Sequence, residues 1–307
     1  MISIEEIKNF FRGYIALNEP LNKHTSFRIG GPADYYFEPD DKEDTVLIVG
    51  FLLRQDIPFV TIGKGTNLLV SDEGYRGAVV NLEKSLKSMY AEGNRIYAEA
   101  GVSLNRFVDF CIQRELQGVE MLAGIPGTIG GAVIMNAGAY GGEISNYFVN
   151  TEIVRSKTIV VLKKEEIGFT YRRSAFRKDD VVLSASFELP KGNREELMKK
   201  RNDLVLQRNR KHPVDYPNCG SVFKNPDSSP TARLVEMAGL KGRQIGDAQI
   251  AEKHGNFIIN LGDAAAEDVL ALMNLIRKTI YEKFGITLEP EVKMIGFPNR
   301  SLKDFAL

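Results

Sequence analysis

The sequence predicts an α+β protein built in two parts, and three observations support this. Short runs with strand periodicity recur through about the first 190 residues. The run Pro190-Lys-Gly-Asn193 then interrupts the pattern, and a long charged helical pattern follows. Helix and strand patterns alternate from there to the end of the chain. We therefore expect a β-rich part of about 190 residues and an α+β part of about 100, which are ordinary domain sizes.

The elements of the first part follow from capping and periodicity. Ser3-Ile-Glu-Glu6 is a capping box that begins a short helix. Ser103 caps a later helix, whose apolar residues from Leu104 to Ile112 share one face. We expect a further helix at residues 42–54, and strands at residues 59–63, 78–82, 95–100, 158–162 and 181–189.

The second part begins with a basic helix expected from Arg194 to Lys211, which links the two parts. Ser229 is a helix N-cap with Pro230 at the first helical position, and Gly239 stops that helix. We expect a strand at residues 256–260, a helix at 264–284 and a closing strand within 287–296.

The composition is typical of a globular protein and does not indicate binding to nucleic acid or insertion into a membrane. The 307 residues are 43% hydrophobic and 26% charged, as in ordinary globular chains. Lys+Arg and Asp+Glu both number 40, so no overall field attracts nucleic acid or an anionic membrane. The first residues are acidic, and no apolar run approaches the roughly 20 residues that span a bilayer. We expect a cytoplasmic protein with no membrane insertion and no obligatory protein partner.

Cysteine and histidine do not indicate a metal site. Cys111 lies in a helical pattern and Cys219 in a loop, which gives neither a disulfide framework nor a cysteine-based metal site. His24, His212 and His254 are scattered and match no zinc motif. We interpret His24 and His254 as structural or rim residues.

Glycine dominates one uncharged segment. Seven glycines fall within the nineteen residues 124–142. Glycine reaches positive φ and lets main-chain N–H groups approach a ligand closely, which suits a pyrophosphate. Apolar residues such as Ile125 and Val133 indicate packing beneath the loop. The segment favours a large phosphorylated cofactor, and a glycine-rich surface turn is the alternative.

A second glycine turn, Gly63-Lys-Gly-Thr-Asn67, follows a predicted strand and can also aim N–H groups at a phosphate. It is neither a Walker loop nor a Rossmann fingerprint, because the Gly-Lys-Ser/Thr ending and the third glycine are missing. A structural turn is the alternative.

Three polar segments have the residue types that catalysis uses. Tyr171-Arg-Arg-Ser174 places two guanidinium groups, which bind carboxylates or phosphates bidentately, beside a phenol, and a solvated basic turn is the alternative. Ser221 lies just before a short predicted strand and lacks the hydrolase elbow, so its hydroxyl fits a proton donor or ligand contact. Glu289-Pro-Glu291 lies on a predicted strand whose alternation puts both carboxylates on one face, and a solvated edge is the alternative.

In this order, the motifs resemble the UDP-N-acetylenolpyruvoylglucosamine reductase family. The similarity covers nearly the whole chain and rests on Thr25-Ser-Phe-Arg-Ile-Gly-Gly31, Gly63-Lys-Gly-Thr-Asn67, Gly124-Ile-Pro-Gly-Thr-Ile-Gly-Gly131 with Asn136-Ala-Gly-Ala-Tyr140, Tyr171-Arg172, Gly220-Ser-Val-Phe-Lys-Asn225 and Glu289-Pro-Glu-Val292. The resemblance implies an FAD-binding domain of the vanillyl-alcohol-oxidase (PCMH) type in two α+β subdomains, plus a C-terminal α+β substrate-binding domain. It places them at residues 1–198, split near residue 83, and at 199–307, with the last residues packing back on the first domain.

The resemblance also implies the chemistry. In that family NADPH reduces FAD, which reduces UDP-N-acetylenolpyruvoylglucosamine to UDP-N-acetylmuramate, a precursor of peptidoglycan. Ser221 matches the proton donor, and Arg172 and Glu291 match its catalytic companions, so we expect these three to line one pocket near the flavin. The matching substrate-binding residues are Tyr171, Lys211 and Asn225.

Noncovalent FAD is the implied cofactor. The residues that the resemblance assigns to its binding come from the two glycine segments: Gly63, Lys64, Gly65, Thr66, Asn67, Leu68, Gly124, Ile125, Pro126, Gly127, Thr128, Gly130, Gly131, Ala132, Asn136, Ala137, Gly138 and Ala139.

One difference from some members of the family indicates which type of member the chain resembles. Some members have a tyrosine-bearing loop over the nucleotide, whereas residues 227–258 are short and lack tyrosine, as in the shorter type. Two other classes stay open. A flavin oxidase of the same fold family would not be expected to share Gly-Ser-x-Phe-Lys-Asn or Glu-Pro-Glu, and a non-catalytic nucleotide-binding protein would not need Ser221. The colour of the purified protein and its bleaching by NADPH distinguish these classes.

Overall fold

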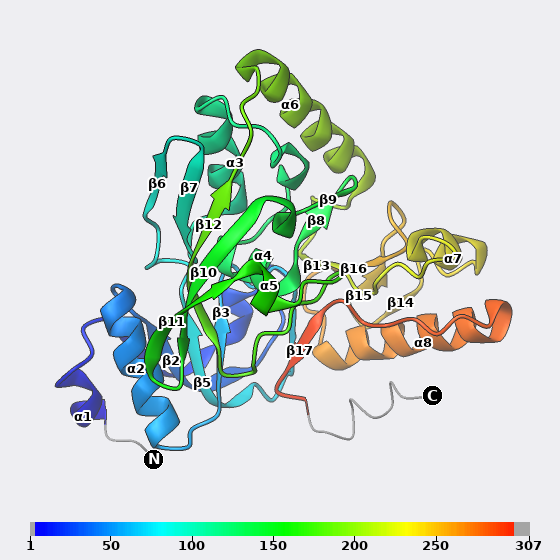
Figure 1. Ribbon diagram of the computed structural model, residues 1–307. Helices are drawn as coiled ribbons and strands as arrows, with labels where there is room; N and C mark the ends of the chain where they lie inside the picture. Colours follow the sequence, from blue (N-terminus) through cyan, green and yellow to red (C-terminus); the bar gives the residue numbers. More distant parts are fainter. Residues whose placement is uncertain (1–3, 298–307) are drawn as a thin grey trace. The chain divides into compact units, whose positions relative to one another are not determined.

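The computed structural model describes residues 4–297, which form two compact units (Figure 1). The first unit comprises residues up to 17, 35–64 and 77–207, and the second comprises residues 18–34, 65–76 and those from 208 on. The chain therefore passes between the units five times. The domains expected at 1–198 and 199–307 are continuous stretches, and their division of function stays a prediction. The expected packing of the last residues falls on 298–307, outside the described residues.

Two sheets organise the first unit. One has the order β1-β2-β5-β3, with β3 and β5 parallel, and the other has the antiparallel order β11-β10-β12-β7-β6. The strands of the first sheet are β1 (Tyr14–Pro20), β2 (Pro32–Glu38), β3 (Phe59–Ile62) and β5 (Tyr75–Asn81). Those of the second are β6 (Met89–Glu92), β7 (Arg95–Glu99), β10 (Phe148–Arg155), β11 (Thr158–Lys163) and β12 (Val181–Glu188).

Helices cover these sheets and share one core with them. The short helix α4 packs on β12 and β7, and the Phe107 ring of α3 lies 4.8 Å from the Phe187 ring of β12. Ser103 caps α3 as predicted, because its hydroxyl accepts the N–H of Arg106. The helices are α1 (Ile4–Lys8), α2 (Lys42–Arg54), α3 (Leu104–Gln113), α4 (Ile129–Met135), α5 (Lys164–Ile167) and α6 (Arg194–Lys211). The expected bounds of α2 and α6 are confirmed.

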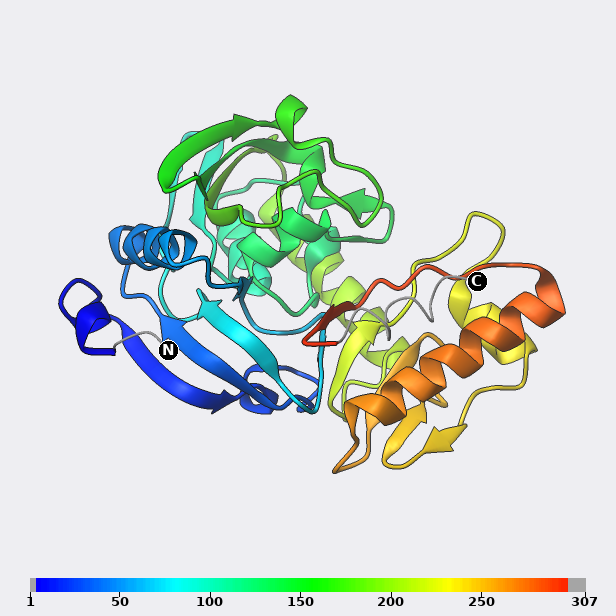
Figure 2. The ribbon, with the colours of Figure 1, turned by 90° about the horizontal axis from the view of Figure 1, so that it is seen from below.

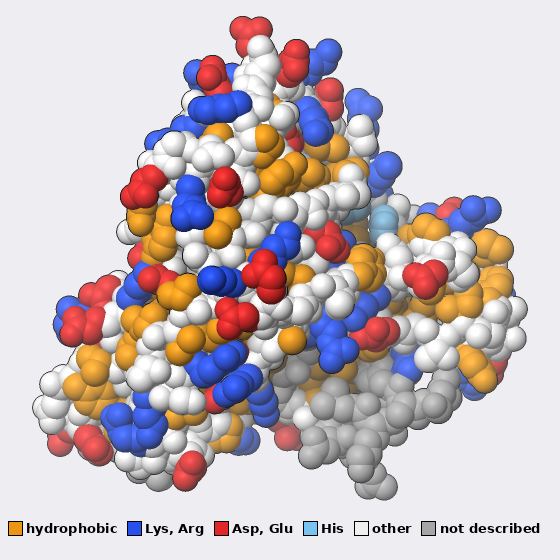
Figure 3. Space-filling view, in the orientation of Figure 1, with side chains coloured by type: hydrophobic (Ala, Val, Ile, Leu, Met, Phe, Trp, Pro, Cys, Tyr) orange, Lys and Arg blue, Asp and Glu red, His pale blue; other side chains and the backbone are white. Residues whose placement is uncertain are grey.

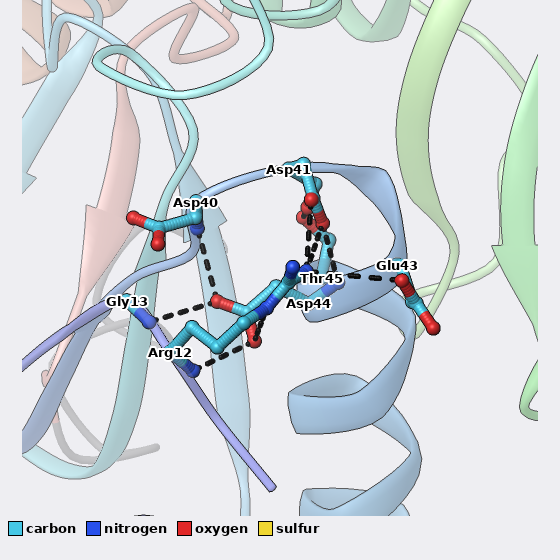
Figure 4. A network of polar contacts seen from close by, with 7 residues as sticks. All are labelled: Arg12, Gly13, Asp40, Asp41, Glu43, Asp44 and Thr45. Carbon is cyan, nitrogen blue, oxygen red and sulfur yellow. Dashed lines mark hydrogen bonds and ion pairs between the residues drawn. The ribbon is translucent and has the colours of Figure 1, made fainter.

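A buried carboxylate holds the start of α2 (Figure 4). The Asp44 side chain is fully buried. Its Oδ1 accepts the N–H of Arg12 at 3.0 Å, and its Oδ2 accepts those of Gly13 at 2.9 Å and Asp40 at 3.0 Å. Asp41 caps the helix by accepting the N–H of Asp44 at 2.9 Å. One side chain thus joins the segment before β1, the end of β2 and α2.

The second unit is a small antiparallel sheet of order β13-β16-β15-β14, with α8 lying across it (Figure 2). Phe27, Ile29 and Leu69 join the core formed by the C-terminal segment. A separate parallel pair joins β4 to β17. The elements are β4 (Leu68–Val70), α7 (Thr231–Met237), β13 (Asn218–Ser221), β14 (Gln244–Ile245), β15 (Ala248–Ile250), β16 (Phe257–Asn260), α8 (Ala266–Phe284) and β17 (Lys293–Ile295).

Several local expectations were wrong. Ser221 ends β13 instead of preceding a strand, and Cys219 lies in that strand, not in a loop. The expected cap at Ser229 moves to Pro230, which has no side-chain capping bond, and α7 begins at Thr231. Glu289-Pro-Glu291 precedes β17, and only Pro290 makes an isolated bridge, to Phe223. Proline has no N–H for a ladder, so a regular strand is not sustained through it.

The elements that were not predicted include β10 and α4. β10 is interrupted by register shifts at Phe148/Asn150 and Glu152/Ile153, which disturb the alternation that marks a strand. α4 forms inside the glycine segment, where glycine disfavours a helix, because Ile129 and Val133 are fully buried. Tertiary packing therefore decides the conformation of both segments.

Acidic and basic side chains are interspersed on the face drawn in Figure 3, in keeping with the balanced composition. Within residues 4–297, no helix is long and apolar enough to cross a membrane. The same residues contain no group of three or more His, Cys, Asp or Glu side chains that could hold a metal ion.

Candidate active site

The first residue of the shorter cofactor segment, Gly63, approaches the longer segment within the first unit. A Cβ on Gly63 would lie 2.4 Å from Thr128 Oγ1, so only glycine allows this approach. The segment from Gly124 is anchored to the start of α3, because Gly124 N–H donates to Asn105 Oδ1 at 2.9 Å and Leu104 N–H donates to the Gly127 carbonyl at 3.1 Å. Gly65, Thr66, Asn67 and Leu68 belong to the second unit, and the other predicted cofactor residues belong to the first.

Not every glycine in these segments faces solvent. Gly130 N–H donates to the Ala100 carbonyl at 2.9 Å, and a Cβ on Gly130 would lie 3.0 Å from Ala100 Cβ. Gly130 therefore serves close packing, and its N–H is not the phosphate donor that the glycine pattern suggested. Gly131 is exposed, and a Cβ there would meet Thr128 Oγ1 at an ordinary 3.7 Å.

The composition of the two cofactor segments fits the pyrophosphate of FAD. Neither residues 63–68 nor residues 124–139 contain a carboxylate, and Lys64 and Gly131 are exposed. Backbone N–H groups and one cation can satisfy a phosphate without a cluster of charged side chains. The residues present therefore fit the implied cofactor.

Arg172 is held firmly in the first unit. It occupies a tight turn with φ of 53°, and its Nη2 donates to the Gly138 carbonyl at 2.5 Å while Nη1 lies 3.9 Å from Glu143 Oε1. Its guanidinium also lies 4.8 Å from the ring of Tyr171, which is exposed. The solvated-turn interpretation does not fit a side chain that is only 17% exposed.

The side chain of Asn136 is hydrogen-bonded to residues beside that turn. It caps α4 in the left-handed conformation and is fully buried. Its Nδ2 donates to Glu143 Oε2 at 2.7 Å and to the Thr170 carbonyl at 3.0 Å, and its Oδ1 accepts the Ser145 N–H at 3.3 Å. The side chain of this predicted cofactor residue is thus engaged in shaping the Arg172 turn.

Ser221 and Glu291 come from neighbouring segments of the second unit. Gly220, with φ of 80°, directs β13 into Ser221, and the Glu291 N–H donates to the carbonyl of Val222 at 2.9 Å. Both side chains are half-buried. Among residues 4–297, the Ser221 hydroxyl has no hydrogen-bond partner. The predicted proton donor and the predicted catalytic carboxylate are therefore held on one backbone frame.

Glu289, Asn225 and Lys211 also lie in the second unit. Lys224 Nζ pairs with Glu289 Oε1 at 2.6 Å, so Glu289 is engaged in an ion pair at the surface. Asn225 is exposed, and its Oδ1 accepts the N–H of Thr231 at the start of α7 at 3.0 Å. Lys211 is the exposed last residue of α6. The structure describes Arg172 in a different unit from Ser221 and Glu291, and their common pocket stays a prediction.

Two histidines form an aromatic cluster in the second unit. The His212 ring lies 5.2 Å from His254 and 4.8 Å from Phe257. Burial, helped by the charges of Arg208 and Lys211, lowers the pKa of His212 to about 3. Burial likewise lowers the pKa of His254. Their placement agrees with a structural role for His254.

Sequence reasoning missed the residues that orient the candidate site. Glu143 faces Arg172, Asn105 holds Gly124, and Asn256 brackets Phe223 with two hydrogen bonds of 3.1 and 2.7 Å. Glu143 is the first acidic residue after the glycine segment, which was the one available signal. Asn105 and Asn256 have no local pattern, because their partners are distant in sequence.

Comparison with known proteins supports the resemblance. Residues 33–161 match the family described as FAD binding domain, and residues 212–295 match the C-terminal domain of UDP-N-acetylenolpyruvoylglucosamine reductase. The reductases of Caldanaerobacter subterraneus and Lachnoclostridium phytofermentans are 44% and 42% identical, each over 96% of this chain and over 98% and 97% of their own lengths. The structure of the Thermus caldophilus reductase superimposes with a TM-score of 0.79 at 32% identity, covering 93% of this chain and 100% of that chain. The chain therefore has an FAD-binding domain, and it belongs to the UDP-N-acetylenolpyruvoylglucosamine reductase family.

Proposed function

We propose that the protein uses NADPH and tightly bound, noncovalent FAD to reduce UDP-N-acetylenolpyruvoylglucosamine to UDP-N-acetylmuramate in peptidoglycan synthesis. The observation that carries this proposal is the 44% identity, over 96% of the chain, to a relative with that name. The pyrophosphate-compatible surface of the two glycine segments supports the cofactor. We place the reaction in the cytoplasm, with a small-molecule substrate and no nucleic acid, membrane or obligatory protein partner.

The chemistry that bound FAD supplies is the transfer of hydride from NADPH to the terminal carbon of the enolpyruvyl group. Negative charge then develops on the neighbouring carbon and its carboxylate. Arg172 offsets that charge, because the Gly138 carbonyl and Glu143 fix the plane of its guanidinium. A preorganised cation stabilises developing charge without further reorganisation.

Ser221 delivers the proton in this proposal. A serine hydroxyl is a weak acid in water, yet in a closed site it can protonate a strongly basic carbon. Its freedom from hydrogen bonds to residues 4–297 leaves the proton available. Glu291 polarises the same reacting group, while Tyr171, Lys211 and Asn225 bind the substrate.

Anaerobic half-reactions test the function. The purified protein should be yellow, acid precipitation should release its flavin, and NADPH should bleach it. Adding UDP-N-acetylenolpyruvoylglucosamine should restore the colour, whereas UDP-N-acetylglucosamine, which lacks the enolpyruvyl group, should not. The proposal fails if no flavin copurifies, if the flavin stays on the polypeptide, or if only oxygen restores the colour.

A further inference from the structure

The cofactor loop is bonded directly to the Glu291 segment within the second unit. Asn67 Nδ2 donates to the Glu291 carbonyl at 3.1 Å, and Lys293 N–H donates to the Asn67 carbonyl at 2.9 Å. The parallel pairing of β4 with β17 begins at the next residue, where Leu68 faces Lys293. The backbone on both sides of Val292 is therefore attached to Asn67.

The same loop is bonded to the strand that carries Ser221. Ser26 N–H donates to the Gly65 carbonyl at 3.1 Å, and its hydroxyl donates to the Asn218 carbonyl at 2.7 Å. Asn218 begins β13 and Ser221 ends it. The motif at residues 25–31, which had no role in the candidate site, thus joins the cofactor loop to the proposed proton donor.

The two catalytic segments are also joined to each other. Val222, the residue after Ser221, accepts the Glu291 N–H at 2.9 Å and donates its own N–H to the Asn256 carbonyl at 2.9 Å. Asn256 is only 2% exposed, so this frame has little freedom to relax. A displacement at the cofactor loop is consequently passed to both catalytic side chains.

We propose that Asn67 and Ser26 are positioning residues, which hold Glu291 and Ser221 in place from the cofactor loop. This inference rests on the proposed reductase function. Neither side chain has to touch substrate. Misplacing a reacting group by about 1 Å can cost on the order of a hundredfold in rate, so one lost hydrogen bond in the frame is sufficient.

The decisive variant is Asn67→Ala, with Gln249→Ala as its matched control. Gln249 also donates a side-chain amide N–H to a backbone carbonyl, that of Gly242 at 3.5 Å, in the same unit, and neither residue is one of those bonded in the frame. Because Asn67 belongs to the predicted cofactor loop, Asn67→Ala is compared with the wild type after saturation with FAD, and its rates are expressed per bound flavin. Its reoxidation by substrate should slow by about tenfold to a hundredfold. Amide hydrogen exchange should accelerate in the peptide spanning residues 289–293, and the control should match wild type throughout.

Ser26 gives an independent test with a rescue. Ser26→Ala should slow reoxidation and accelerate exchange in the peptide spanning residues 218–223, whereas Ser26→Thr, which keeps the hydroxyl, should restore both. Wild-type reoxidation and exchange in the Ala variants would overturn the positioning role while leaving the reductase function intact. Unchanged reoxidation per bound flavin in Asn67→Ala, even with a loss of FAD affinity, would also overturn the positioning role of Asn67. Failure of substrate to reoxidise the wild type would refute the function itself.

Discussion

The buried carboxylate of Asp44 predicts a specific loss of stability on a nearly isosteric change. In Asp44→Asn, one oxygen becomes an amide that cannot accept a hydrogen bond. If the remaining oxygen keeps its hydrogen bonds from the N–H groups of Gly13 and Asp40, the N–H of Arg12 faces the new amide NH2, which is also a donor. An orphaned buried donor costs about 1–3 kcal/mol, and losing the negative charge near the helix N-terminus removes about 0.3–1 kcal/mol more. We expect a loss of about 2–3 kcal/mol, or roughly 4–12 °C in melting temperature for a unit of this size.

Thermal unfolding followed by circular dichroism measures this loss. Glu43→Gln is the matched control, because it makes the same carboxylate-to-amide change one residue away on a side chain that is 79% exposed. That control should melt with the wild type. If Asp44→Asn also melts within about 1 °C of wild type, the hydrogen-bond network does not stabilise α2.

Four further outcomes are expected. Ser221→Ala should leave bleaching by NADPH nearly intact but slow reoxidation by substrate by about a hundredfold or more, and equal damage to both half-reactions would contradict its proposed role as proton donor. Gly130→Val should lower FAD retention measured by flavin absorbance while the second unit stays folded, because even its Cβ would lie 3.0 Å from a neighbouring Cβ. The pKa of His212 is lowered to about 3 in the folded protein, whereas in the unfolded chain it is about 6.5. Between these pH values the unfolded chain is protonated at His212 and the folded chain is not, so the free energy of unfolding should fall as pH drops from about 6.5 toward 3. Urea titrations of His212→Gln should show a flatter fall, and an unchanged slope would refute the assignment. Burial raises the pKa of Cys111 and brings that of Cys219 to about 12, so a thiol reagent at pH 8 should label neither cysteine until the protein is denatured.

The sequence was most informative where local chemistry decides the structure. The bounds of α2 and α6 and the Ser103 cap were predicted correctly, because capping and apolar periodicity act within a few residues. The α+β class and the family followed from motifs in a fixed order. None of these signals requires knowledge of a distant partner.

The parts that were missed depend on contacts between distant residues. Glycine propensity argued against α4, yet burial of its apolar residues stabilises the helix. The structural role of Gly130 differs from the predicted one for the same reason, because its N–H donates to the Ala100 carbonyl, thirty positions earlier in the chain. Likewise, the bonds from Asn67 to Glu291 and from Ser26 to Asn218 join residues 224 and 192 positions apart, which no local pattern reports. The predicted catalytic set itself stays a prediction.

The interleaving of the two units has a consequence for how the chain is made. The core of the second unit includes Phe27 and Leu69, but it also needs Val292 near the other end of the chain. At about 5–20 residues per second, roughly 11–45 seconds separate the synthesis of Leu69 from that of Val292. During that interval the early apolar residues have left the ribosome before their partners exist. The nascent chain is therefore a natural client for chaperones that shield apolar segments, and a stalled or truncated product would keep those segments exposed and prone to aggregate.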